Sequence, residues 1–451
     1  MSMMVNNSSE ATSGSADGPA LKPRVGLLGV VMFGAGTAIG VSIFSVLGPA
    51  AAVAGSGLLI AMLLAALPML PFALVYAFLG SALPRSGASY EWPARFVHPL
   101  FGFLIAWLRI LGSVGVIITL ATVLVNYLGM VWMLPALVTK AVVITVIFGV
   151  HLVGIRLAAG VQTLMMLVLL ASMALLVGTG LPKVDVTLLA QPLAAGWPAV
   201  LAAVPLMITL FLGIESATEI GEEVRDARRN IPRGIALAVA LTVVVYAAVA
   251  SVALGLVGPA RLGASAAPLL EAARVPLGAW AVPVIVGAAV FAVLKTLNAT
   301  VMIFSRYLFA MGRAGVLPAA LGRLAPSRGT PVMALGLAWV GAMLGLLLPS
   351  NLVFLLLAVN IPTMLKYMGS CLAAISVVTR HPAIHQQASL ALSRGTVLVA
   401  AVLGVVASLA IILAGLKADV WPYLLITGWG LVGGGVWWVR SVWPAASPGP
   451  Q

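Results

Sequence analysis

Residues 34–40 read GAGTAIG and lie in the middle of the first long apolar segment of the chain. Each glycine in a helix interior costs about 1 kcal/mol relative to alanine, so this run disfavours a continuous helix. Backbone released at membrane depth must face protein or a water-filled cavity, because lipid offers it no hydrogen-bond partner. We therefore predict an interrupted helix with a cavity beside it. The alternative is that the glycines only allow helices to pack closely.

The composition of the whole chain is that of a membrane protein. Of the 451 residues, 62% are hydrophobic and 8% are charged, against about 25% charged in soluble domains. Apolar stretches of the length that crosses a bilayer, about 20 residues, follow one another from residue 25 to 439. The alternating segments typical of a β-barrel are not found. The sequence thus predicts an all-α protein with the lipid bilayer as its main solvent.

The apolar stretches predict twelve transmembrane helices, which fall into three groups. Five lie within 25–180, five within 198–377, and two within 395–440. Residues 1–24 are polar and are expected to form a disordered tail, and residues 441–451 form a second tail. Lys and Arg concentrate in one set of alternate loops, which places both tails in the cytoplasm and the chain in the cell (inner) membrane.

The sixth segment repeats the interruption of the first. Residues 212–218 read LGIESAT, and a carboxylate at this depth costs several kcal/mol unless it is paired, protonated or hydrated. Glu215 is therefore a candidate functional residue. Interruptions at corresponding positions of two halves are typical of inverted-repeat secondary transporters, with the substrate site between them.

Other kinds of function find little support in the sequence. The formal charge is +13, but the basic residues are scattered singly, so nucleic acid is not an expected partner. The one cysteine, Cys371, lies in an apolar stretch, and the histidines fall at predicted helix ends or in loops. Neither a nucleophile–base pair nor a set of metal ligands is apparent. We expect no enzyme, no metal and no cofactor.

Four motifs in the chain resemble those of the amino acid-polyamine-organocation superfamily. They are GTAIGVSIF at 36–44, PRSGASY at 84–90, FLGIES at 211–216 with GEEVRDARRNIPR at 221–233, and SRYLFAMGRAGVLP at 305–318 with Thr330-Pro331 beyond. The resemblance implies the five-plus-five inverted repeat of the leucine-transporter-like fold. It also implies secondary active transport of amino acids or related amines, coupled to protons or by exchange.

Within this resemblance, the two interruptions provide the substrate site. Helix N-termini attract carboxylates, and carbonyl ends attract ammonium groups. We expect the substrate ammonium at carbonyls near Ala35 and at Phe211, Leu212 and Gly213, and its side chain against Phe211 and Ile214. The substrate carboxylate is expected at Gly36, Thr37, Ala38, Ile39 and Gly40.

Three charged residues within the spans are candidates for coupling or gating. Glu215 either gates protons and helix movement or simply joins helices through hydrogen bonds. Arg109 is expected to pair with Glu219 or Glu222 at the inner gate. Lys295 lies where sodium-coupled relatives of this fold hold an ion. It either replaces that ion and changes protonation during transport, or is a constant structural cation paired with helix carbonyls.

The expected substrate is a neutral amino acid, because Glu215 is the only acidic residue near the predicted site. The alternatives are a polyamine or organic amine, carried or exchanged, and a non-transporting amino acid sensor on the same fold. A monomer and a weak homodimer both remain compatible with the sequence.

The position of Lys295 predicts that uptake does not require sodium. Proteoliposomes containing the protein should accumulate neutral amino acids equally well when sodium is replaced by choline. A strict sodium requirement would contradict the assignment of Lys295 to the ion position.

Overall fold

The computed structural model describes residues 21–129, 131–265, 267–326, 329–347, 352–415 and 421–442. Within these ranges the regular structure is helical, with two isolated bridges joining Val25 to Val224 and Ser86 to Ile220. The same ranges contain nine segments long and apolar enough to cross a bilayer, and three shorter apolar helices. The chain is therefore a multi-pass membrane protein. Most of the expected tails, 1–20 and 443–451, lies outside the described residues.

The helices fall into two successive series along the chain. The first series comprises α1 (Leu27–Ala38), α2 (Ser42–Ala54), α3 (Leu58–Ala66), α4 (Met69–Ala82), α5 (Ala88–Phe96), α6 (Pro99–Leu128), α7 (Ala136–Val153) and α8 (Ile155–Gly180). The second comprises α9 (Gly196–Ile208), α10 (Ala227–Ala264), α11 (Pro268–Leu277), α12 (Ala281–Arg313), α13 (Val332–Gly345), α14 (Leu352–Arg380), α15 (Pro382–Gln387), α16 (Arg394–Gly415) and α17 (Trp421–Val442).

The interruption predicted in the first segment is confirmed. Helix α1 ends at Ala38, α2 begins at Ser42, and the residues between them leave the helical path. Both interpretations of the glycines hold, but for different glycines. A methyl group at Gly34 would come within 2.6 Å of the Ile214 carbonyl oxygen, and one at Gly36 within 2.7 Å of the Gln162 amide nitrogen. These two are packing glycines within α1, whereas Gly40 lies in the break itself.

The second interruption is longer and less helical than the first. Helix α9 gives way to a short 3₁₀ turn that ends at Phe211, and Leu212 is extended. Gly213 has φ +98°, a backbone conformation that favours glycine. The chain continues through two further 3₁₀ turns, η5 (Ser216–Glu219) and η6 (Gly221–Glu223). The carboxylate of Glu215 is thus attached to irregular backbone.

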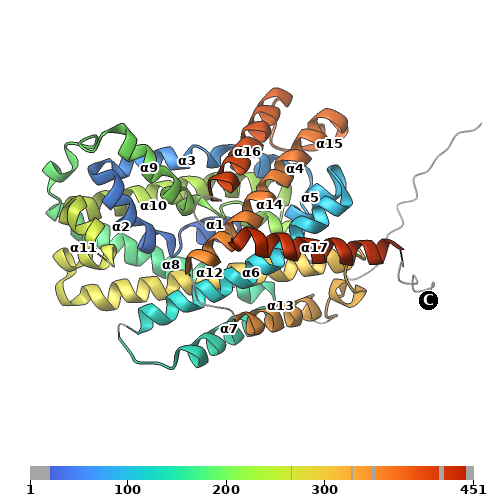
Figure 1. The fold of residues 1–451 in the computed structure, drawn as a ribbon, viewed down its shortest axis with the longest axis horizontal. Coiled ribbons are helices and arrows are strands. Elements are labelled where there is room, and N and C mark those ends of the chain that lie inside the picture. The colour runs from blue at the N-terminus through green and yellow to red at the C-terminus, as the bar shows by residue number, and fades with distance from the viewer. Residues whose placement is uncertain are drawn as a thin grey trace, which may run out of the picture.

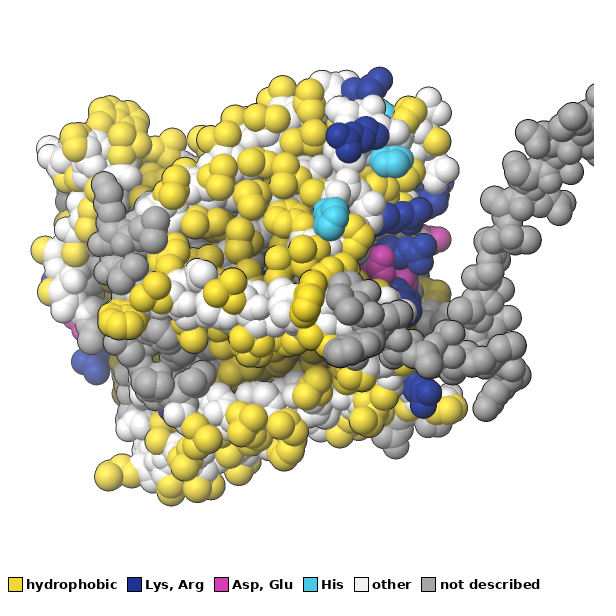
Figure 2. Space-filling view, turned by 45° about the vertical axis from the view of Figure 1, so that its right-hand side comes forward, with side chains coloured by type: hydrophobic (Ala, Val, Ile, Leu, Met, Phe, Trp, Pro, Cys, Tyr) yellow, Lys and Arg dark blue, Asp and Glu magenta, His cyan; other side chains and the backbone are white. Residues whose placement is uncertain are grey.

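Several long helices run along the long axis of the molecule, and charge gathers at one end. Figure 1 shows α6, α12 and α17 running along the long axis, with α11 near the left end and α5 and α15 at the right. Figure 2 shows a broad hydrophobic face with Lys, Arg and His side chains concentrated on its right-hand side. We use the term charged end for the cluster of ion pairs formed by Arg85, Glu222, Glu223, Arg306 and Arg313.

Residues 21–24, at the end of the expected N-terminal tail, are tied to this charged end. Leu21 is buried. The backbone N–H of Arg24 donates to the Glu223 carbonyl at 2.8 Å, and that of Arg225 donates to the Val25 carbonyl at 2.8 Å. The start of α1 is therefore fixed to the loop that follows the second interruption.

Close packing of α5 on α6 depends on Gly102. A Cβ atom there would collide with the backbone nitrogen and Cα of Ala94. Gly102→Ala should therefore destabilise the protein by about 1–3 kcal/mol, as overpacking usually does, and should lower the melting temperature of the purified protein. Gly149→Ala in α7 is the matched control, because nothing lies within 4 Å of its added methyl group. Equal melting temperatures for the two variants would contradict the packing argument.

Candidate functional site

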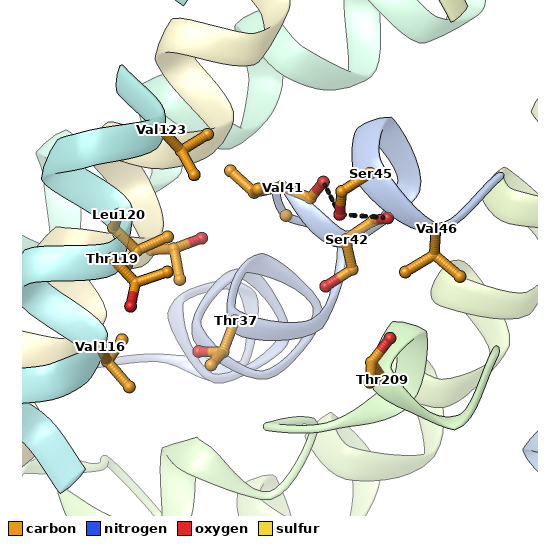
Figure 3. Close-up of a pocket in the computed structure, with 12 residues that line it drawn as sticks. Thr37, Val41, Ser42, Ser45, Val46, Val116, Thr119, Leu120, Val123 and Thr209 are labelled. Carbon is orange, nitrogen blue, oxygen red and sulfur yellow. Dashed lines mark hydrogen bonds between the residues drawn. The ribbon is translucent and has the colours of Figure 1, made fainter. Parts of the chain in front are cut away.

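A cavity of about 230 Å³ adjoins the break between α1 and α2. Figure 3 shows Thr37, Val41 and Ser42 of the broken segment facing side chains of α6 across this space. The lining residues are Thr37, Gly40, Val41, Ser42, Ser45, Val46, Val116, Thr119, Leu120, Val123, Thr209 and Thr296. No charged side chain is among them. The predicted cavity is thus present, with walls from both series of helices.

Hydroxyl groups supply most of the polar character of this cavity. The hydroxyls of Thr37, Thr119 and Thr296 each donate at 2.8 Å to a carbonyl one turn back in their own helix. Their oxygen lone pairs remain as acceptors. Helix α2 begins in the cavity wall at Ser42, and the first N–H groups of a helix lack acceptors within it. Four valines and Leu120 form the apolar remainder.

Tyr246 satisfies the polar backbone of the first break. Its hydroxyl donates to the Ala38 carbonyl at 2.7 Å and accepts from the Gly40 N–H at 3.2 Å. The side chain comes from α10 and is fully buried. The Gly40 N–H, expected at a substrate carboxylate, is therefore engaged by protein in this structure. A tyrosine in a long apolar segment gave no sequence signal for this contact.

Lys295 lies against the carbonyl end of α1. Its ammonium donates a hydrogen bond to the Gly36 carbonyl, and the side chain is fully buried in α12. The Ala35 carbonyl accepts instead from the Ile39 N–H. Of the residues expected to bind substrate at the first break, Thr37 and Gly40 line the cavity, whereas Ala35, Gly36, Ala38 and Ile39 are buried in packing.

The residues expected at the second interruption lie around the first cavity but not in its wall. Phe211 packs edge-on against Tyr246, with the ring centroids 6.4 Å apart. Gly213 contacts Thr37, and Ile214 packs beside α1. Leu212 lines a second, largely apolar cavity of about 350 Å³ between α9, α14, α16 and α17. The lining residue from this part of the chain is Thr209, which the sequence did not single out.

Glu215 forms a buried ion pair with Lys366 of α14. The two side chains approach to 2.5 Å, and each is at most 6% exposed. The Tyr367 hydroxyl donates to the other carboxylate oxygen at 2.9 Å. The Lys366 ammonium also lies 4.7 Å from the Tyr367 ring centroid. The carboxylate thus connects the second interruption to α14, a partner that sequence spacing alone could not identify.

Ion pairs join the elements that meet at the charged end. The Arg306 guanidinium donates to both carboxylate oxygens of Glu223 at 2.9 Å, and both side chains are buried. Arg313 donates to both oxygens of Glu222 at 2.8 Å. Burial acts to raise the pKa of Glu222, but the hydrogen bonds and charge of Arg313 outweigh it and hold that pKa below its usual value. These pairs tie η6 to α12.

The predicted pairing of Arg109 with Glu219 or Glu222 is not formed in this structure. Arg109 donates to the Thr363 hydroxyl at 2.8 Å and lies 6.0 Å from the centre of the Tyr307 ring. Glu222 is engaged by Arg313, and Glu219 accepts from the hydroxyl of Tyr307, the residue whose ring Arg109 lies over. Tyr307 thus contacts both Arg109 and Glu219, where the prediction expected these two to contact each other directly.

Comparison with known proteins agrees with this architecture. The sequence model of the amino acid permease family matches residues 25–433. An uncharacterized transporter of Mycobacterium tuberculosis is 35% identical over 70% of this chain and 71% of its own length. The branched-chain amino acid permease of Bacillus subtilis is 26% identical over 82% of this chain and 84% of its own. The methylthioribose transporter of the same organism is 27% identical over 83% and 85%.

The buried pair of Glu215 and Lys366 predicts strong energetic coupling. Lys366→Met leaves an unpaired buried carboxylate and should cost about 3–5 kcal/mol, whereas the double variant with Glu215→Gln should recover much of that loss. The melting temperatures of the wild type, the two single variants and the double variant measure this coupling. Arg261→Ala breaks the exposed pair with Glu271 and should cost at most about 1 kcal/mol. Additive effects of the two core substitutions would contradict the pairing.

Proposed function

This chain belongs to the amino acid permease family, and from that premise we propose that it carries a neutral amino acid across the membrane by alternating access, without sodium. The family match confirms the resemblance to the amino acid-polyamine-organocation superfamily. The observation that carries the proposal is the uncharged cavity at the break between α1 and α2. Such a cavity suits a substrate whose own charges cancel.

The lining favours an aliphatic amino acid over an amine. Polyamines and dibasic amino acids carry excess positive charge, which a carboxylate in the wall would balance. Glu215 does not line the cavity, and Lys366 neutralises it. The valines and Leu120 offer a surface for a branched apolar side chain. The similarity to a branched-chain amino acid permease points in the same direction.

The geometry also suggests where the carboxylate and the ammonium of the substrate bind. We place its carboxylate at the start of α2, near Ser42, where free N–H groups and the positive end of the helix dipole face the cavity. Its ammonium then lies near the Thr37 carbonyl. The neighbouring carbonyls of Gly36 and Ala38 already accept from Lys295 and Tyr246. This arrangement narrows the site expected from sequence to the residues around Thr37 and Gly40.

The ion pairs at the charged end support alternating access. Ion pairs between η6 and α12 hold the helices together at the charged end. The cavity lies at the break between α1 and α2. With the charged end in the cytoplasm, as the distribution of Lys and Arg favours, this is a state closed toward the cytoplasm. Transport then requires these pairs to separate.

Lys295 and Glu215 have different parts in this proposal. The Lys295 ammonium on the Gly36 carbonyl supplies the positive charge of a bound cation, which leaves protons or substrate exchange as the means of coupling. Glu215, held by Lys366 and Tyr367, joins the second interruption to α14. Its contacts favour the structural interpretation over a proton gate.

The test combines binding with transport. Purified protein is screened by thermal shift against amino acids and common amines, since a ligand that binds the folded state raises the melting temperature. Neutral aliphatic amino acids should give the largest shifts and should support counterflow in proteoliposomes. Val123→Trp fills the cavity and should reduce uptake by roughly tenfold or more, a loss of about 1.4 kcal/mol. Val142→Trp, at an exposed site in α7, is the matched control and should leave uptake unchanged.

Two results would redirect the proposal. Stabilisation by diamines but not by neutral amino acids would favour the amine alternative. Stabilisation without any counterflow would favour a sensor on this fold.

A further inference from the structure

Three buried glutamates lie along the second interruption and the turns after it, at every fourth position, and one of them lacks a cationic partner in an ion pair. Glu215, Glu219 and Glu223 are each at most 2% exposed. Glu215 pairs with Lys366, and Glu223 pairs with Arg306. Across the described ranges, neither Lys nor Arg forms an ion pair with Glu219. A carboxylate at this depth is costly unless it has a function or a partner.

Neutral donors hold Glu219 instead. One carboxylate oxygen accepts from the Ser89 N–H at 3.2 Å. The other accepts from the Ser89 hydroxyl and from the Tyr307 hydroxyl, the latter at 3.0 Å. The Glu219 backbone carbonyl also accepts from the Gly87 N–H at 2.9 Å. Glu219 therefore attaches both α5 and α12 to the broken segment, next to the charged end.

The elements around Glu219 carry several ionisable groups. Tyr307 of α12 bonds to it directly, and its neighbour Arg306 is engaged by Glu223. Arg109 of α6 lies over the Tyr307 ring. The remaining groups are Tyr76 of α4, Tyr90, Glu91 and Arg95 of α5, Lys366 and Tyr367 of α14, and the exposed Arg228, Arg229 and Arg233 of α10. Helix α1, which packs against η5, has no ionisable side chain.

A chain of hydroxyl groups leads to Glu219 from the neighbouring helices. The Ser370 hydroxyl donates to the Tyr76 hydroxyl at 2.9 Å. The Tyr76 hydroxyl lies 3.1 Å from that of Ser89, which bonds to Glu219. All four side chains are buried. Hydroxyl groups both donate and accept, so such a chain can pass a proton.

We propose that Glu219 binds the proton that couples transport to a pH gradient, an inference that rests on the proposed function. As a carboxylate it accepts three hydrogen bonds and keeps α5 and α12 on the broken segment. Protonation removes the negative charge that strengthens these three hydrogen bonds, which weakens the attachments and favours opening of the charged end. Release of the same proton to the solution there restores the carboxylate. One proton crosses the membrane in each cycle.

The test uses proteoliposomes with an imposed pH gradient. Wild-type protein should concentrate its amino acid when the side of entry is acidic. Glu219→Gln should lose this accumulation, while the substrate still raises its melting temperature, which shows that it folds. Glu271→Gln is the control at the opposite end of the molecule and should behave as wild type.

Two further variants test the role of the hydrogen bonds. Ser89→Ala and Tyr307→Phe remove donors that hold the charged form, so protonation should occur at higher pH. The pH of half-maximal gradient-driven uptake should rise by about one unit for each lost bond. A merely structural role would not move this midpoint.

The outcomes separate the two proposals. Accumulation that persists in Glu219→Gln overturns the assignment of the proton to Glu219. Wild-type transport that does not depend on the pH gradient also overturns this assignment, but it leaves the proposed function intact. If Glu219→Gln does not fold, an unshifted midpoint in the two donor variants overturns the inference. Wild-type protein that neither binds nor carries an amino acid overturns both.

Discussion

The demand of backbone polar groups for hydrogen bonds in a medium without water shapes this molecule. Two segments give up helical bonds at membrane depth, and side chains from distant parts of the chain replace them. Tyr246 bridges Ala38 and Gly40, Lys295 binds the Gly36 carbonyl, and Tyr367 accepts from the Gly213 N–H at 3.4 Å. Each replacement ties an interruption to a helix of the second series. The cavity lies beside the break that Tyr246 and Lys295 support.

The three buried glutamates along the second interruption have partners of different charge. Glu215 is held by an ammonium, Glu219 by neutral hydroxyls and an N–H, and Glu223 by a guanidinium. Their partners come from different helices: α14 for Glu215, α5 and α12 for Glu219, and α12 for Glu223. A segment with only ion pairs would be locked, and one with none would be unstable in lipid. The middle position combines burial with a weaker hold, which suits a part that must move.

The sequence predicted the all-helical membrane architecture and the positions of both interruptions, because glycine content and hydropathy are local properties. It left two alternatives open for Lys295, and the hydrogen bond to the Gly36 carbonyl agrees with the one that paired this ammonium with helix carbonyls. It did not predict Tyr246, Lys366 or Thr209, whose contacts depend on which helices pack together. Arg109 shows the same limit, because Tyr307 contacts both it and its expected partner Glu219. Gly34 and Gly36 could not be distinguished from Gly40 without knowing where α1 ends.

The attachment of Lys295 has an energetic consequence for the proposed carrier. A sodium ion arrives from one side and leaves on the other, and its fall down a concentration gradient does work in every cycle. An ammonium covalently bound to α12 completes the same electrostatic arrangement but never leaves. A site built in this way gives structural support and no driving force. The protein would then not depend on external sodium, and accumulation would have to draw its energy from another gradient.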